Sequence, residues 1–385
     1  MLGKYISKSR LSLLLGAMLV AVAVACSSPE PTATPVPTAV PTAVPVIEKE
    51  VIKFHDGQWG SNWVHLAVAG YVIENGYGYE VENVQGTTGT SKLTLVEGDV
   101  HINMETWRMN VPEWYNEHTA SGVLTDLAGT THPQTMLPAG SPGQTIAVAG
   151  QGFYVPRYMV EGDAERGIEA TAPDLKGIDD LPQYKHLFAD PEDPSKGRVF
   201  NCILGWECQK IVRAKWHAYG LYDDYNVVEP GGSAALKAAV VSPYESGDPF
   251  LSYYWQPTDV VNLRDLILLE EPKHTAECQE AMDLAVTEEP YESTIGCGFP
   301  IGDAHVVVNT AFAERQPNIV EFLTNYYVDS KPLAQMEADK MEADAEWVDV
   351  AVDFLKANED VWTSWITTDD SAEVIANMKA ALAAE

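Results

Sequence analysis

The sequence predicts an α/β fold for the part of the chain that follows about residue 46. The apolar fraction of 46% is that of an ordinary globular protein. Strand-like and helix-like patterns also alternate early in the chain, which implies parallel strands joined by crossover helices. These first elements are, in order, a strand at 51–55, a helix at 62–74, a strand at 79–85, a short helix at 90–98 and a strand at 99–105.

The later elements continue the pattern, although helices dominate the C-terminal end. The segment QTIAVAGQGFYVP, at 144–156, is typical of a connecting strand. A helix at 208–221 is expected to end near Gly220, and the next helix is expected to break at Pro243. PFLSYYW (249–255) and HVVVN (305–309) are further predicted strands.

The N-terminal segment is predicted to direct export. Three basic residues precede the apolar run LSLLLGAMLVAVAVA, which is too short to span a bilayer comfortably. With Ala23 and Ala25 before Cys26, residues 1–26 resemble a bacterial lipoprotein signal peptide, whose cleavage leaves a lipidated Cys26 at the N-terminus. An ordinary signal peptide or an uncleaved anchor is the alternative. Residues 27–46 are rich in Pro and Thr and form a predicted tether.

The charge of the chain limits the kinds of ligand and macromolecule that it is expected to bind. Lys and Arg number 24 against 56 Asp and Glu, for a net charge of −32. A polyanion repels nucleic acid and anionic lipid headgroups and favours cationic or zwitterionic ligands. A surface that serves only solubility is an equally good interpretation of this charge.

Apart from Cys26, the chain contains Cys202, Cys208, Cys278 and Cys297. An even number of cysteines in an exported protein favours disulfides. Three pairings are possible, and the local one, Cys202–Cys208 with Cys278–Cys297, closes the shortest loops. A zinc site is disfavoured because the C-x5-C spacing is wide and no histidine is near. A ring this short adds only about 2 kcal/mol of stability, so we expect it to hold one turn rigid.

Three tryptophans stand where the predicted sheet would hold a ligand. Trp107 follows the strand at 99–105, Trp255 ends the strand at 249–255, and Trp206 precedes the helix at 208–221. Ligands of open α/β sheets lie beyond the carboxyl ends of the strands. Trp59 and Trp63, around the first strand-to-helix turn, could also reach the cleft, but we expect them to pack in the core.

Four motifs, in order along the chain, carry a resemblance to a known family. They are HINMETW, NCILGWECQKIVRAKWHAYGL with its C-x-x-G-W-x-C loop, PFLSYYWQPT and GCGFPIGDAHVVVN. From about Lys53 to the C-terminus the chain resembles the glycine-betaine and proline-betaine binding proteins of bacterial ABC importers. The family's ligand tryptophans would fall on Trp107, Trp206 and Trp255.

The resemblance implies a two-lobed periplasmic-binding-protein fold of type II, with the ligand cleft between the lobes. Residues 47–152 and 299–385 are predicted to form lobe I, and residues 153–298 to form lobe II. The hinges would lie near Gly152 and Gly298, and the lobes would close on the ligand.

The chemistry of a quaternary ammonium agrees with this prediction. Such a cation has no N–H to donate, so aromatic faces recognise it better than hydrogen bonds do. The Cys202–Cys208 ring would fix Trp206 as one wall of a tryptophan box. The backbone N–H groups of Glu207 and Cys208, at a helix N-terminus, would favour the carboxylate of a betaine.

The chain departs from the family at Val111, where some members have a histidine that contacts this carboxylate. Arg108 is the candidate to replace it, because its guanidinium is always charged. Binding of a choline-like or carnitine-like ligand therefore remains an alternative to glycine betaine or proline betaine.

The sequence gives little support to other classes of function. The sequence has no G-x-S-x-G motif and its nine histidines are scattered, so neither an enzyme nor a metal or other cofactor is predicted. A zinc-binding lipoprotein and a surface scaffold are the remaining alternatives. No G-x-x-x-x-G-K-[ST] motif is present, so import, in a role such as osmoprotection, would need an ABC permease and its ATPase on separate chains.

Overall fold

A computed structural model of the chain describes residues 49–129 and 136–385. The predicted signal peptide, the whole of the tether and Cys26 lie outside the described residues. Residues 49–385 form one unit, in which every strand belongs to a sheet that passes through the long strand β5 (Gln144–Pro156).

The first group of strands follows the predicted pattern. Strand β1 (Ile52–Asp56) pairs in parallel with β2 (Val81–Gln85) and with β3 (Ile102–Thr106). Strand β10 (Gly302–Asn309) then runs antiparallel to β3, to the short β4 (Leu124–Asp126) and to β5.

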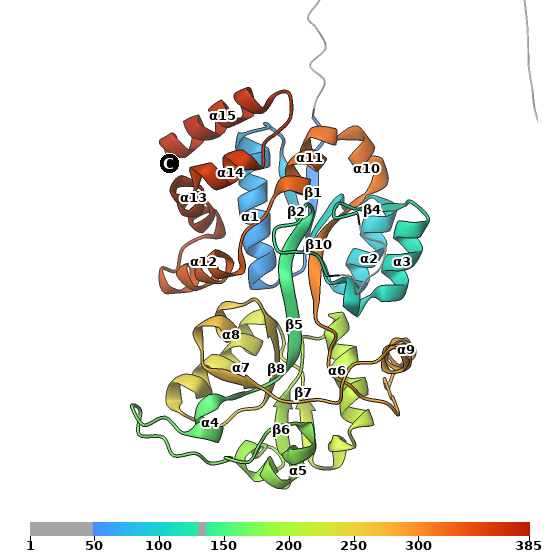
Figure 1. Ribbon diagram of the computed structural model, residues 1–385, viewed down its shortest axis with the longest axis vertical. Coiled ribbons are helices and arrows are strands. Elements are labelled where there is room, and N and C mark those ends of the chain that lie inside the picture. Colours follow the sequence, from blue (N-terminus) through green and yellow to red (C-terminus); the bar gives the residue numbers. More distant parts are fainter. Residues whose placement is uncertain (1–48, 130–135) are drawn as a thin grey trace, which may run out of the picture. The chain divides into compact units, whose positions relative to one another are not determined.

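The second group of strands pairs with the other end of β5. Strand β8 (Ser252–Gln256) and the short β9 (Leu266–Leu268) lie antiparallel to β5. Strand β6 (Gly197–Phe200) joins β8 to β7 (Tyr225–Val228) through parallel pairing. The partner of β5 changes from β10 at Ala149 to β8 at Gly150, and Figure 1 shows β5 running from one group of strands to the other.

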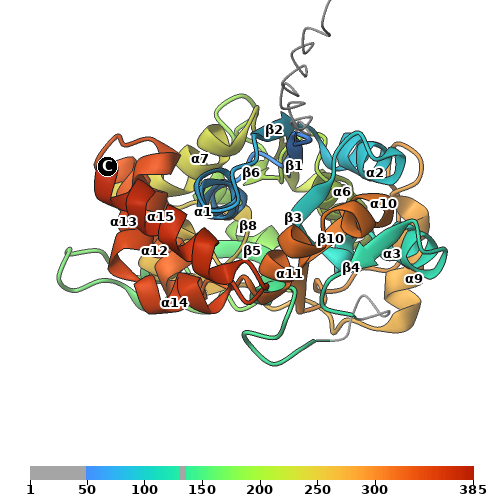
Figure 2. The same ribbon diagram turned by 90° about the horizontal axis from the view of Figure 1, so that it is seen from above.

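Helices cover both sides of the first group of strands (Figures 1 and 2). One set comprises α1 (Gly60–Asn75), α12 (Ser330–Glu342), α13 (Trp347–Ala357), α14 (Glu359–Ser364) and α15 (Ser371–Ala384). The other set comprises α2 (Thr88–Glu97) and α3 (Pro112–Ala120), whereas the buried residues of α10 (Thr310–Arg315) and α11 (Pro317–Asn325) join the same core as those of α1.

The second group of strands has its own helices. They are α4 (Arg157–Glu161), α5 (Leu181–Tyr184), α6 (Glu207–Ala218), α7 (Ser233–Ser246), α8 (Asp259–Leu263) and α9 (Ala276–Ala285). The predicted break at Pro243 is wrong, because α7 continues through this residue to Ser246. A proline removes one backbone donor, and so close to the helix end this loss does not stop the last turn; Gly247, with φ of 79°, ends the helix.

The two largest clusters of buried hydrophobic residues correspond to the two groups of strands, and a smaller one, which includes Leu95, Tyr115 and Val307, also belongs to the first group. The first contains residues from 52–149 together with residues from 304–382, such as Phe54 and Phe322. The second contains residues from 153–269, such as Phe153 and Trp216. Trp107 is half-buried and packs against both cores, so it marks the place where they meet.

Candidate ligand-binding site

A cavity of about 660 Å³, part of it open to solvent, lies where the two cores meet. Its lining includes Trp107, Trp206 and Trp255, the three tryptophans that the sequence singled out. Each comes from a different segment: Trp107 follows β3, Trp206 caps α6, and Trp255 lies in β8. The structure therefore brings together residues that lie up to 148 positions apart in the chain.

The tryptophan rings meet mostly edge to face. The ring centroids of Trp206 and Trp255 are 5.5 Å apart at an angle of 80°. The ring of Tyr254 stacks on that of Trp255, with centroids 4.7 Å apart and an interplanar angle of 7°. Because edge-to-face and stacked pairs are the favoured aromatic geometries, these walls are fixed without any ligand.

Trp59 is an additional wall that the sequence did not predict. It lies in the loop between β1 and α1, lines the cavity, and packs edge to face on Trp206 with centroids 5.4 Å apart. Trp63, in contrast, packs as expected, with its ring 5.6 Å from that of Trp347. Trp59 does pack against a core, as expected, but this is the second core, and its ring also lines the cavity because it contacts Trp206 at the start of α6.

Glu105, the penultimate residue of β3, joins two of these walls. Its Oε2 accepts hydrogen bonds from the indole N–H of Trp59 at 2.8 Å and of Trp107 at 3.1 Å. The side chain is buried and lines the cavity. Burial raises the pKa of Glu105 to about 7, although hydrogen bonds from Trp59, Ser61 and Trp107 act in the opposite direction.

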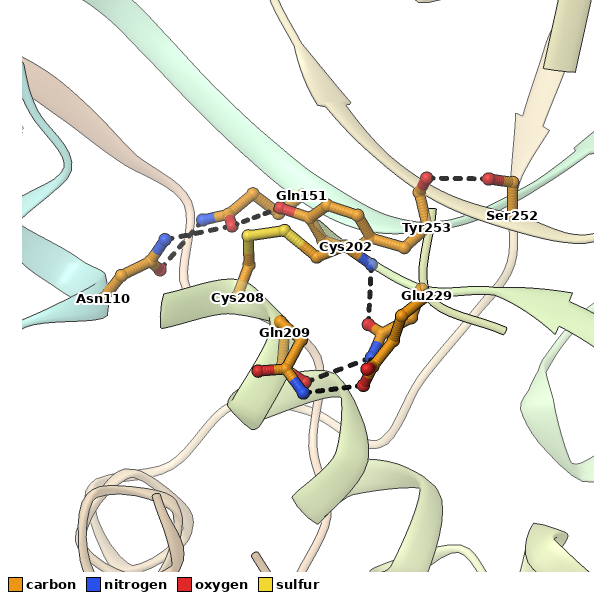
Figure 3. The surroundings of a disulfide bond; sticks show 9 residues. Asn110, Gln151, Cys202, Cys208, Gln209, Glu229, Ser252 and Tyr253 are labelled. Carbon is orange, nitrogen blue, oxygen red and sulfur yellow. Dashed lines mark hydrogen bonds between the residues drawn. A yellow bond between two sulfur atoms is a disulfide. The ribbon is translucent and has the colours of Figure 1, made fainter. Parts of the chain in front are cut away.

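The N-terminus of α6 forms another part of the lining. The structure pairs Cys202 with Cys208 (Figure 3). Trp206 is one of the residues of the loop that this disulfide closes. Glu207 and Cys208 are the first two residues of α6 and both line the cavity. The first N–H groups of a helix have no partner within it, so this end can receive an anion.

Polar side chains connect the middle of β5 to this region. Asn110 and Gln151 exchange two amide hydrogen bonds of 3.0 and 3.1 Å, and the hydroxyl of Tyr253 donates to Gln151 at 2.8 Å (Figure 3). All three residues line the cavity. Gln151 lies one residue beyond the point where β5 changes partner, so the network links both groups of strands.

Arg108 does not reach the cavity. Its side chain is fully buried, and its guanidinium donates to Asp303 and lies 3.1 Å from Nε2 of His305. The prediction that Arg108 replaces the family histidine is therefore not supported by the geometry, because a buried carboxylate already neutralises this cation. Val111 does line the cavity, and it offers no polar atom.

Two further groups with ionisable side chains line the cavity. Burial lowers the pKa of His55 to about 4, so this imidazole is neutral near pH 7. Lys92, on α2, supplies a cation on the same wall. No hydrogen bond or ion pair joins Lys92 to another side chain among the described residues.

The second disulfide lies apart from the tryptophans. The structure pairs Cys278 with Cys297, which ties α9 to the segment before β10, and these cysteines pack on Ala214 of α6. In the described part of the chain, no group of three or more His, Cys, Asp or Glu side chains is placed to hold a metal. No helix among these residues is long and apolar enough to cross a bilayer.

A family model described as the substrate-binding domain of the ABC-type glycine betaine transport system matches residues 50–357. The glycine betaine-binding periplasmic protein OusX of Dickeya dadantii is 25% identical over 203 residues, which are 52% of this chain and 56% of that protein. The glycine betaine/proline betaine-binding periplasmic protein of Escherichia coli is 29% identical over 177 residues, or 43% of this chain and 51% of that protein. The chain thus spans about half the length of the curated relatives it matches.

A solved structure described as an ABC-transporter choline binding protein in complex with choline has a similar fold. It superposes with a TM-score of 0.60 and 17% identity, and the match covers 86% of this chain and 98% of that one. This likeness confirms the predicted fold class, a two-lobed binding protein of type II.

Proposed function

This chain belongs to the family of substrate-binding domains of ABC-type glycine betaine transport systems, and from that premise we propose that it captures a quaternary ammonium compound outside the cytoplasm. It then delivers this ligand to an ABC permease and an ATPase on separate chains. The single observation that carries the proposal is the meeting of Trp59, Trp107, Trp206 and Trp255 on one cavity.

The tryptophan walls suit a methylated cation. Each aromatic face contributes about 0.5–2 kcal/mol to a cation that has lost its water. Ammonium and alkali ions would lose more hydration than these faces return, so the box favours a bulky, weakly hydrated cation. In this proposal Trp107, Trp206 and Trp255 bind the ligand as the sequence predicts, and Trp59 joins them.

The carboxylate of a betaine would be bound at the N-terminus of α6. The backbone N–H groups of Glu207 and Cys208 are its proposed partners, since Arg108 is engaged elsewhere. The side chain of Glu207 pairs with Lys210 at 3.2 Å, which reduces its repulsion of a ligand carboxylate. Glycine betaine and proline betaine remain the first candidates, and choline or a carnitine-like molecule is the alternative.

Closure of the lobes is part of the proposal. Lobe I is assigned to residues 47–152 and 299–385, and lobe II to residues 153–298. The change of partner along β5, next to Gly152, and the start of β10 shortly after Gly298 support hinges at these two glycines. The structure already contains a contact across the proposed lobes, the hydrogen bond from the Ser233 hydroxyl to the carbonyl of Gln58. We infer that such contacts belong to the closed form and break when the lobes open.

Attachment to the membrane is the remaining part of the proposal. Lipidation of Cys26 would anchor the protein after the signal peptide is cleaved off in front of Cys26, with residues 27–46 as the tether. Mass spectrometry of the N-terminal fragment from membranes tests this step: a diacylglycerol-modified Cys26 is expected, and an unmodified or uncleaved N-terminus would contradict it.

A thermal-shift and calorimetry panel tests the function. The purified protein is titrated with glycine betaine, proline betaine, choline, carnitine and zinc. Saturable binding of at least one quaternary amine, accompanied by a change in tryptophan fluorescence, is expected. Stabilisation by zinc alone would favour a metal-binding lipoprotein, and no saturable binding at all would favour a scaffold.

A further inference from the structure

Glu105 holds an unusual position among the residues that line the cavity. One oxygen of its carboxyl group, Oε2, accepts the indole N–H of both Trp59 and Trp107. These two rings come from different segments, the loop before α1 and the end of β3. A single buried oxygen thus fixes two walls of the cavity relative to each other.

The other oxygen, Oε1, has no partner of good hydrogen-bond geometry among the described residues, although the hydroxyl of Ser61 is close enough to act on the pKa of the carboxyl group. The nearest basic atom is Nε2 of His65 on α1, at 3.6 Å, and Nδ1 of His65 lies 2.8 Å from the hydroxyl of Tyr326. Burial lowers the pKa of His65 to about 3, so this imidazole brings no positive charge to the carboxyl group. A carboxylate here is therefore buried without a protein cation beside it.

The other ionisable groups around Glu105 do not change this conclusion. On β1, His55 lines the cavity but is neutral near pH 7, and beyond α11 the buried Tyr326 also stays neutral. Arg108, close by in the chain, is paired with Asp303. Lys92 lines the same cavity from α2, but no ion pair within the described ranges joins it to Glu105.

We propose that Glu105 is both the positioning residue for Trp59 and Trp107 and the counter-charge for the bound quaternary ammonium. This inference rests on the proposed function and adds to it, because the site then recognises the positive charge itself as well as the methylated surface. A buried, unpaired carboxylate costs free energy, and a cation placed in the box removes that cost.

The proposal predicts that binding is linked to a proton. In the empty site, with a pKa of about 7, Glu105 is partly protonated at neutral pH. A bound cation stabilises the carboxylate and lowers this pKa, so binding releases a proton to the buffer. Affinity should then rise as the pH increases up to about 7 and stay constant above it.

The first test needs only the wild-type protein. Binding of choline and of glycine betaine is measured by calorimetry in two buffers with different ionisation enthalpies, at about pH 6.5 and about pH 8.5. The measured enthalpy should depend on the buffer at the lower pH and not at the higher one. A ligand that binds with no buffer dependence at either pH would overturn the proposal.

The second test separates the contribution of the ligand's positive charge from that of its methylated surface. Each ligand is compared with its uncharged-centre isostere, in which carbon replaces nitrogen: 3,3-dimethylbutan-1-ol for choline and 3,3-dimethylbutanoate for glycine betaine. Glu105→Gln keeps an oxygen for the two indole N–H groups but removes the negative charge. The preference of the wild type for the cation should fall by about tenfold or more in this variant, and the buffer dependence should disappear.

The control is Glu117→Gln. Glu117 lies on α3, its side chain is 77% exposed, and it does not line the cavity. This variant should match the wild type in both measurements. If Glu105→Gln also keeps the full preference for the cation, the proposal is wrong even though the function stands. If the wild type binds none of these amines, the proposed function itself fails.

Discussion

Substitution of Trp59 by leucine distinguishes a wall of the binding cavity from a core residue. Leucine keeps an apolar side chain but removes the aromatic face and the N–H that donates to Glu105. One face is worth about 0.5–2 kcal/mol toward a cation, which corresponds to roughly 2- to 30-fold in Kd. The substitution also removes the hydrogen bond from Trp59 to Glu105, so we expect Kd to increase by about tenfold or more.

Trp63→Leu is the matched control, because it changes the same residue type four positions along the chain. The indole of Trp63 donates to Asp56 at 2.9 Å, its ring packs on Trp347, and it does not line the cavity. Calorimetry with the best ligand of the panel gives Kd, and thermal unfolding gives stability. Both variants should lose stability, but only Trp59→Leu should lose affinity; equal affinities for the two variants would refute the assignment of Trp59 to the site.

Three further outcomes are expected. Trp255→Ala should weaken binding by over about tenfold in calorimetry, and retained affinity would remove this residue from the site. Reduction of the Cys202–Cys208 ring should also weaken binding, because Trp206 gains mobility; unchanged affinity with both thiols shown to be free would refute this role. Asp303→Asn should lower the unfolding free energy by about 1.5–3 kcal/mol at neutral pH, because it removes the charged acceptor of the hydrogen bond from Arg108, and urea titration measures this; no measurable loss would contradict the assigned pairing.

The pH dependence of stability is an independent test of the contribution of the Asp303 carboxylate. Burial acts to raise the pKa of this carboxyl group, but hydrogen bonds from His305, the Leu137 N–H and Gln144 prevail and lower it to about 2. A lowered folded-state pKa means that the contribution is complete above the unfolded value and is lost as the pH falls toward 2. The midpoint of thermal unfolding of the wild type should therefore drop more steeply below about pH 4 than that of Asp303→Asn.

The alternation of elements and the position of three tryptophans at strand ends and a helix start were sufficient to predict much of the fold and of the cavity. Local patterns carry this information: β5 spans 144–156 as its sequence predicts, and Trp107 directly follows β3. These are properties of neighbouring residues. They need no knowledge of which distant segments touch.

Apart from the continuation of α7 through Pro243, the main features that sequence reasoning missed depend on contacts between distant segments. Arg108 follows Trp107 and is charged, so it was a reasonable candidate for the site, but its partner Asp303 lies 195 positions away. The ring of Trp59 is turned toward Trp206, which no local pattern indicates. Glu105 lies in a strand whose residues are all buried, and only the two indole donors show that it belongs to the cavity.

A crystal structure of the protein grown with the best quaternary amine of the panel tests the central claim most directly. The account predicts one ligand in this cavity, with its methylated nitrogen within about 6 Å of the ring centroids of Trp59, Trp107, Trp206 and Trp255. A ligand bound elsewhere, or one whose ammonium group faces solvent while its other end meets the tryptophans, would contradict it.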